Sequence, residues 1–130
     1  MWKLYERPKG ERRKSVYPAI NINKGGMFLN HMACEMIGMK APGDIRFFLF
    51  HYDDNDKNRY GFRVLKNKQE NLKNQYRVKY RHQNKTAKIN VKQFIITFDL
   101  LERTRKVEQT TFPLIKDNKE GEDFYYFELK

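Results

Sequence analysis

The sequence contains very little cysteine. Its 130 residues include only Cys34, which excludes an internal disulfide and argues against a structural zinc site built from thiolates. Cys34 lies among apolar residues, between Met32 and Ile37, in a pattern typical of the core-facing turn of a helix. We therefore expect a buried, unreactive thiol, a reducing compartment and a cytoplasmic location.

Long apolar runs are also missing. No stretch approaches the ~20 apolar residues that a helix needs to cross a bilayer. The N-terminus has no apolar segment of the kind found in signal peptides. We therefore expect no membrane partner.

Signatures of catalysis and of cofactor binding do not occur. The sequence has neither the phosphate-binding loop G-x-x-x-x-G-K-[ST] nor the dinucleotide motif G-x-G-x-x-G. The histidines at positions 31, 51 and 82 are far apart and have no cysteine or carboxylate at metal-ligand spacing. In the acidic turn near Asp54, Arg59 and Leu65 occupy the places where a calcium loop has glycine and glutamate. We expect no enzyme activity, no catalytic residues, no metal, no cofactor and no small-molecule substrate.

Aromatic residues and charges are abundant instead. Aromatic side chains make up 15% of the chain and charged ones 33%, so the chain has the large side chains that disordered proteins lack. Its length suits one domain. We expect a basic N-terminal arm at residues 1–15, followed by a single α+β domain at 16–130.

The positive charge is concentrated in one segment. From Arg59 to Lys92 there are eleven Lys or Arg residues and one acid, Glu70, which gives 11 − 1 = +10, against +11 for the whole chain. Clustered positive charge is typical of surfaces that bind a phosphate backbone. The pattern favours a surface that binds nucleic acid over a basic surface that only keeps the protein soluble.

Within this segment, residues 76–81 alternate between apolar and cationic side chains. Successive residues of a strand point to opposite faces of a sheet, so three cations should share one face. We add the cations of the neighbouring predicted strands and turn to these three. The predicted nucleic-acid-binding residues are then Arg46, Arg63, Lys66, Arg77, Lys79, Arg81, Lys85 and Lys88.

Proteins that bind single strands also use aromatic rings on which bases stack. The candidates are Phe48, Phe50 and Tyr52, which share a strand face with Arg46, together with Tyr60. Burial in the core is an equally good interpretation of these four residues.

Periodicity predicts the remaining organisation. Adjacent glycines after Lys24 predict a hairpin turn, and Asn30 is a typical N-cap. We expect strands at 16–23, 27–29, 45–52, 59–66, 76–83, 86–91, 110–116 and 123–129, with helices at 31–39 and 92–105. The fold class is α+β, with antiparallel, strongly bent sheets or a barrel-like sheet and two helices. Two similar halves, 16–66 and 76–130, predict a pseudo-twofold repeat of strand-strand-helix-strand-strand.

Two families resemble parts of this chain. Four strands that run into a helix through Lys88-Ile89-Asn90-Val91-Lys92-Gln93-Phe94, and the stretch Lys24-Gly25-Gly26-Met27-Phe28-Leu29-Asn30, are similar to the single-stranded-DNA-binding transcription coactivators of the positive-cofactor type and the plant Whirly proteins. This resemblance implies two paired units that form a β-surface for an extended single strand. Its basic sheet positions match Arg46, Arg63, Arg77, Lys79 and Arg81.

The second resemblance covers residues 16–66. The stretch Ile20-Asn21-Ile22-Asn23-Lys24-Gly25-Gly26-Met27-Phe28-Leu29, a helix that ends at Ile37-Gly38-Met39, and then Gly43-Asp44 before a strand are similar to the AbrB-like swapped-hairpin regulators. This second resemblance implies duplex-DNA binding as a dimer through basic hairpin residues. The chain departs from that pattern by an insertion at 67–91 and by lacking a second Gly-Asp element.

These patterns predict a non-catalytic protein that binds nucleic acid, with single-stranded DNA of little sequence preference as the favoured partner. RNA in place of DNA is compatible with the same patterns. A second candidate function is that of an AbrB-like regulator of transcription that binds duplex DNA. A third is a protein-interaction or virion structural module whose basic face meets an acidic protein. The sequence also leaves a homo-oligomer open.

Overall fold

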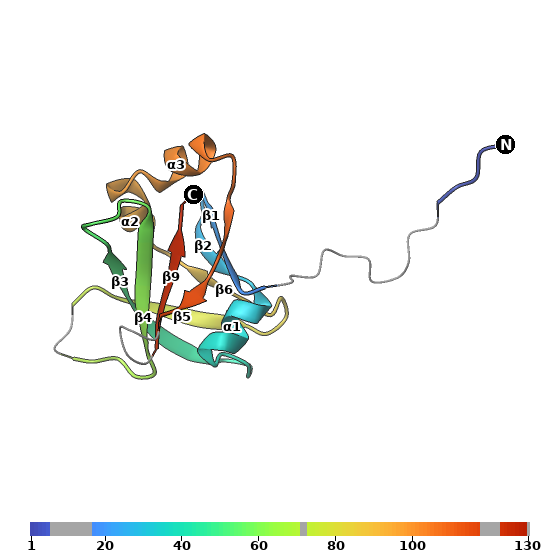
Figure 1. The fold of residues 1–130 in the computed structure, drawn as a ribbon. Helices are drawn as coiled ribbons and strands as arrows, with labels where there is room; N and C mark the ends of the chain where they lie inside the picture. Colours follow the sequence, from blue (N-terminus) through green and yellow to red (C-terminus); the bar gives the residue numbers. More distant parts are fainter. Residues whose placement is uncertain (6–16, 71–72, 118–122, 130) are drawn as a thin grey trace.

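The computed structural model describes residues 1–5, 17–70, 73–117 and 123–129, so most of the predicted basic arm at 1–15 lies outside the described residues. The chain forms a mixed α+β fold in which antiparallel strands predominate (Figure 1). The elements are β1 (Ala19–Asn23), β2 (Gly26–Leu29), α1 (His31–Ile37), β3 (Ile45–Tyr52), β4 (Arg59–Leu65), β5 (Gln75–Arg81), β6 (Thr86–Ile89), α2 (Lys92–Thr97), α3 (Leu100–Lys106), β7 (Thr111–Pro113), β8 (Ile115–Lys116) and β9 (Phe124–Glu128).

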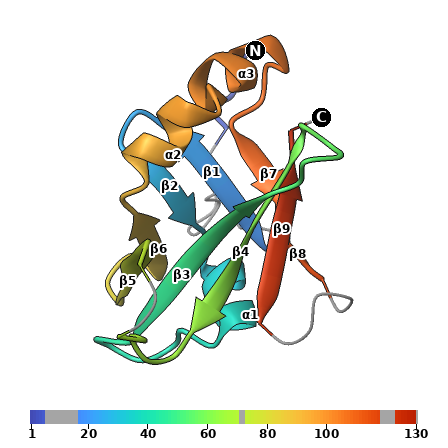
Figure 2. The same cartoon turned by 90° about the vertical axis from the view of Figure 1, so that its left-hand side faces the viewer.

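The strands form one sheet that curls into a nearly closed barrel (Figures 1 and 2). Their order is β7-β1-β2-β6-β5-β3-β4-β9-β8, and all neighbours are antiparallel. The two end strands, β7 and β8, are consecutive in the chain and only Leu114 separates them. One stretch of chain, residues 111–116, therefore pairs with β1 on one side and with β9 on the other.

The register of these pairs decides which side chains face the interior. Directly opposed residues of antiparallel strands lie on the same face of the sheet. Phe48 lies opposite both Val64 and Tyr76, and its neighbour in the core, Phe62, stacks on it with ring centroids 4.6 Å apart. The resulting interior is one apolar core, and its largest fully buried side chains are Tyr125, Phe48, Phe62, Phe112, Phe127, Ile20, Ile22, Met27, Leu29, Met39, Ile89 and Leu100.

Local sequence signals set the first half of the barrel. The hairpin between β1 and β2 turns at residues 23–26, as predicted, and Gly26 has a φ of 130°. A Cβ on Gly26 would lie 2.5 Å from the carbonyl oxygen of Ile89, so β6 could not approach β2 there with any other residue. The predicted N-cap is confirmed, because Asn30 Oδ1 accepts a hydrogen bond of 2.9 Å from the Ala33 N–H.

The predicted helix at 92–105 is wrong as a single element. It is broken into α2 and α3 at Asp99, which has a left-handed φ of 54°. Both Ile95 and Leu100 are buried. In a straight helix, side chains five positions apart point about 140° away from one another, so the break lets both reach the same core.

Helices cover both ends of the barrel. Figures 1 and 2 show α2 and α3 across one end and α1 at the other. Arg103 of α3 donates hydrogen bonds to the Tyr60 hydroxyl and, at 2.6 Å, to Asn58 Oδ1. This guanidinium joins α3 to the start of β4 and closes one end of the core. In the described part of the chain, no helix is long and apolar enough to span a membrane.

The predicted thiol environment is confirmed, because Cys34 lies on the buried face of α1 and is fully buried. Burial, with a smaller contribution from the neighbouring Glu35 carboxylate, raises its pKa to about 12. We expect the native protein at pH 8 to react with a thiol reagent such as Ellman's reagent far more slowly than the urea-unfolded protein, since the thiolate is the reactive form. Equal rates in the two states would contradict this prediction.

Candidate nucleic-acid interface

A cationic groove of about 540 Å³ lies on the outer face of the β5–β6 hairpin. The alternation along β5 is as predicted: Arg77, Lys79 and Arg81 are exposed, whereas Val78 and Tyr80 are buried. The groove is lined by Gly43, Arg77, Lys79, Tyr80, Arg81, His82, Gln83, Asn84, Lys88 and Asn90. It therefore holds four cations and no carboxylate.

The chemistry of this lining suits an anion with several oxygen atoms. Guanidinium groups bind phosphates with two parallel hydrogen bonds, and lysine adds a compact positive charge. The side-chain amides of Gln83, Asn84 and Asn90 add neutral hydrogen-bond donors. Because the lining residues include no acid, none of their side chains repels a phosphate backbone.

The loop before β3 forms one wall of this groove. Asp44 Oδ2 accepts hydrogen bonds from the backbone N–H groups of Lys40, at 3.0 Å, and Ala41, at 2.9 Å. These hydrogen bonds lower the pKa of the Asp44 carboxyl. The Asp44 carbonyl oxygen accepts a 2.8 Å bond from the Tyr80 N–H, which fixes the loop beside β5. Gly43 thereby reaches the groove lining.

The structure brings together half of the predicted cationic residues. Arg77, Lys79, Arg81 and Lys88 line the groove. Lys85 is exposed in the turn of the same hairpin, and Lys66 is exposed just after β4. Arg63 lies on β4, where its guanidinium sits 5.4 Å from the ring centroid of Phe124, away from the groove.

Arg46 does not lie on the same face as the cations of the groove. Arg46 lies opposite Val78, which is fully buried, so it belongs to the inward-facing set of β3. Its guanidinium donates hydrogen bonds to the carbonyl oxygens of Ile45, at 2.9 Å, and Gly38, at 3.1 Å. It ties the end of α1 to β3 and does not line the groove.

The four predicted stacking residues also belong to the inward-facing set. Phe48 and Tyr60 are buried, so neither offers a ring face to a base. Phe50 packs against the rings of Tyr76 and Phe94 in the same interior. The fourth ring, Tyr52, is exposed, but it packs at 5.2 Å on Phe98 beside α2, far along β3 from the groove.

The outward-facing aromatic residues are different ones. Phe47 lies opposite Arg77 on the outer face, and Phe28 lies opposite Lys88, whose Nζ is 5.8 Å from its ring centroid. Sequence reasoning missed Phe47 because 45–50 is apolar at nearly every position, and it did not consider Phe28. The signal that separates the faces is the register with β5, which pairs Phe47, and not Phe48, with a cation.

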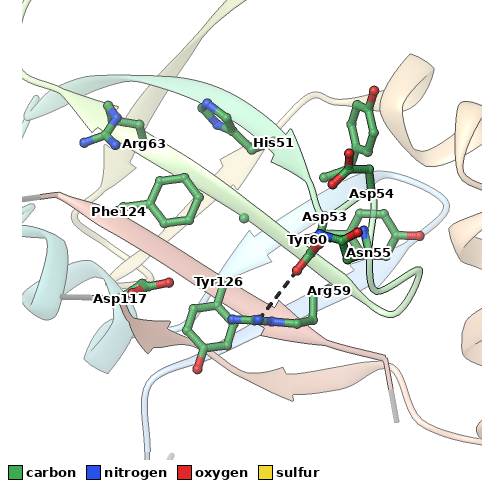
Figure 3. A pocket seen from close by; sticks show the side chains of 12 residues that line it. His51, Asp53, Asp54, Asn55, Arg59, Tyr60, Arg63, Asp117, Phe124 and Tyr126 are labelled. Atoms are coloured by element: carbon green, nitrogen blue, oxygen red, sulfur yellow. Dashed lines mark hydrogen bonds and ion pairs between the residues drawn. The ribbon is translucent and has the colours of Figure 1, made fainter. Parts of the chain in front are cut away.

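A second hollow, of about 420 Å³, lies over β3, β4 and β9 (Figure 3). Phe124 and Tyr126 project from β9 on the same side, and His51 lies across from them on β3 (Figure 3). The guanidinium of Arg59 lies 4.5 Å from the Tyr126 ring centroid, and its Nη1 atom is 3.5 Å from Asp53 Oδ2. This hollow is aromatic and mixed in charge, unlike the groove.

Gly61 makes this hollow. It lies opposite His51 on one side and Tyr126 on the other, in the middle of the outer face. A Cβ there would lie 2.8 Å from the Tyr125 carbonyl oxygen and 2.9 Å from two atoms of the Phe124 ring. The missing side chain both lets β9 approach and leaves the space open.

Within the described residues, no group of three or more His, Cys, Asp or Glu side chains is arranged to hold a metal ion. Comparisons of the chain with protein-family models, curated proteins and solved structures found no match.

We expect Gly61→Ala to lower the free energy of unfolding by about 1–3 kcal/mol, because the added methyl group overpacks β4 against β9. Urea denaturation measures this loss. Gly25→Ala is the control, since a Cβ there would meet side-chain atoms and no backbone, with Asn23 Oδ1 at 3.3 Å and the Phe28 ring at 3.6 Å as its nearest neighbours. A loss no greater in Gly61→Ala than in the control would contradict the assignment.

Proposed function

We propose that this protein binds single-stranded nucleic acid, with DNA as the favoured form, and that it does so without catalysing a reaction. The observation that supports this most directly is the groove on the β5–β6 hairpin, whose lining holds four cations and no acid. Phosphate contacts supply most of the affinity in binding that ignores sequence. The groove is formed by a hairpin of the barrel, so the backbone positions of its cations are fixed before a ligand arrives.

The outward rings beside the groove favour a single strand over a duplex. Phe47 and Phe28 each lie directly opposite a cation of the groove, Arg77 and Lys88 respectively. An unpaired base can lay its face on such a ring while its phosphate meets the neighbouring cation. In a duplex the base faces are stacked inside the helix, and these rings would find no partner.

We further propose that the two halves, 16–66 and 76–130, are related by a pseudo-twofold axis. The strand pairings support this. Exchanging β1 with β5, β2 with β6, β3 with the β7–β8 stretch and β4 with β9 maps the set of strand pairs onto itself. Such a chain would build within one molecule the paired surface that a homodimer builds from two.

Replacing Arg77, Lys79 and Arg81 together by Ala should weaken binding of a single-stranded DNA oligonucleotide roughly tenfold or more, because three charge-assisted contacts are lost. The slope of log K against log salt should become less negative by about 2, since each phosphate contact on a single strand contributes about 0.7. Fluorescence anisotropy across a salt series measures both quantities.

The matched control replaces Arg105, Lys106 and Lys116, which are exposed on α3 and β8, by Ala and removes the same charge. Equal losses in the two variants would mean that net charge alone attracts the oligonucleotide, and would contradict the proposed groove. Tighter binding of a duplex of the same sequence would contradict the single-strand assignment. Binding of an acidic protein but of no oligonucleotide would contradict the proposed function as a whole.

A further inference from the structure

The hollow over β4 and β9 differs from the groove in its charge. It is lined by the guanidinium groups of Arg59 and Arg63 and by the carboxylates of Asp53, Asp54 and Asp117. The groove lining, in contrast, has four cations and no acid. A phosphate in the hollow would lie among carboxylates that repel it. The ligand that suits this lining is therefore a neutral, polar one.

The shape of the hollow favours a flat ligand. Phe124 and Tyr126 lie two residues apart on the same face of β9, which separates their Cα atoms by about 7 Å. Gly61 contributes no side chain to the space before them. Arg59 lies over Tyr126, with its guanidinium carbon 4.5 Å from the ring centroid, so it covers one face of that ring and offers its own plane to a ligand on that side. A planar ring that enters here meets aromatic and guanidinium faces.

The rim adds hydrogen-bonding groups. The turn that follows β3 places Asp53, Asp54 and Asn55 along one side of the hollow (Figure 3). The Asn55 N–H donates a 2.9 Å bond to Asp53 Oδ1, which holds this turn in one conformation. Carboxylate and amide oxygens accept hydrogen bonds from the exocyclic amino groups of bases. The volume, about 420 Å³, lies in the lower part of the range of about 300–1,000 Å³ that ligand sites occupy.

We propose that this hollow binds one unpaired nucleobase of the bound strand. The proposal rests on the proposed function, because the strand's phosphates are held in the groove and the hollow adds a contact with one of its bases. β3 runs between the two sites: its first residue, Ile45, lies opposite Lys79 of the groove, and His51, near its end, lies opposite Gly61 of the hollow. The hollow would therefore hold one further base of a strand whose phosphates lie in the groove and whose other bases stack on Phe47 and Phe28.

The test compares two single-stranded DNA oligonucleotides of equal length and charge. One contains normal bases with a central 2-aminopurine, and the other has abasic residues throughout. We expect the wild-type protein to bind the first roughly tenfold or more tightly than the second, and to quench the 2-aminopurine fluorescence as the base stacks. In Tyr126→Ala the quenching and the preference for bases should both be smaller than in the wild type, with the part of the preference that comes from Phe47 and Phe28 retained.

Two further variants make the result specific. Tyr126→Phe keeps the ring and should retain the wild-type preference, which shows that any loss in Tyr126→Ala comes from the missing ring. Tyr17→Ala removes an exposed tyrosine elsewhere and should also bind like the wild type. Thermal melts of every variant check that each is folded.

The outcomes separate the two proposals. If Tyr126→Ala keeps the full preference for bases, the base-binding hollow is wrong and the phosphate-binding groove stands. If the wild type binds both oligonucleotides equally, the hollow and the stacking on Phe47 and Phe28 are both wrong, and only the phosphate-binding groove stands. If the wild type binds neither oligonucleotide, both proposals are overturned. If Tyr126→Phe behaves like Tyr126→Ala, the ring is not the contact and the hollow is again wrong.

Discussion

The whole molecule depends on the double pairing of one short stretch of chain, residues 111–116. Its first part lies against β1 and its last part against β9. Pro113, which has no N–H to donate, lies opposite Ala19, and the Leu114 N–H still bonds to the Pro18 carbonyl oxygen at 2.9 Å, so the partner changes between Leu114 and Ile115. With both edges of the sheet paired in this way, one face of every strand encloses a common core and the other faces outward.

This closure explains why the outer surface can hold so many cations. The apolar residues needed for stability are inside, where they fill the barrel from β1 to β9. The outward positions of β5 are then free to be Arg77, Lys79 and Arg81 without a loss of core packing. Because apolar residues fill the interior, the outward positions over β4 and β9 can likewise hold acids and aromatic rings. Two surfaces of different chemistry therefore lie on one barrel.

Much of the fold follows from local sequence patterns. The bounds of β3 agree with the apolar pattern residue by residue, and the N-cap at Asn30 formed as expected, because both signals act within a few residues. The break at Asp99 could not be predicted from the sequence, since helical spacing alone does not show that Ile95 and Leu100 must face the same core.

The candidate site was predictable only where one face of a strand is polar. On β5 the alternation of Val78 with cations fixes the inward side, and the prediction was correct. On β3 both faces are apolar, so the choice between Phe47 and Phe48 needed the register with another strand. The hollow depends on Gly61 lying opposite Tyr126, a pairing between distant parts of the chain that no local pattern contains.

The double pairing of residues 111–116 also has a consequence for biosynthesis. As the chain leaves the ribosome, the six strands from β1 to β6 can pair with one another before the closing stretch exists, because all of them precede it. Until the closing stretch and β9 arrive, β1 and β4 are unprotected edges, and such edges pair readily with other chains. Folding is therefore completed by contacts of high sequence separation, which form slowly. The final strands decide whether a nascent molecule closes on itself or joins its neighbours.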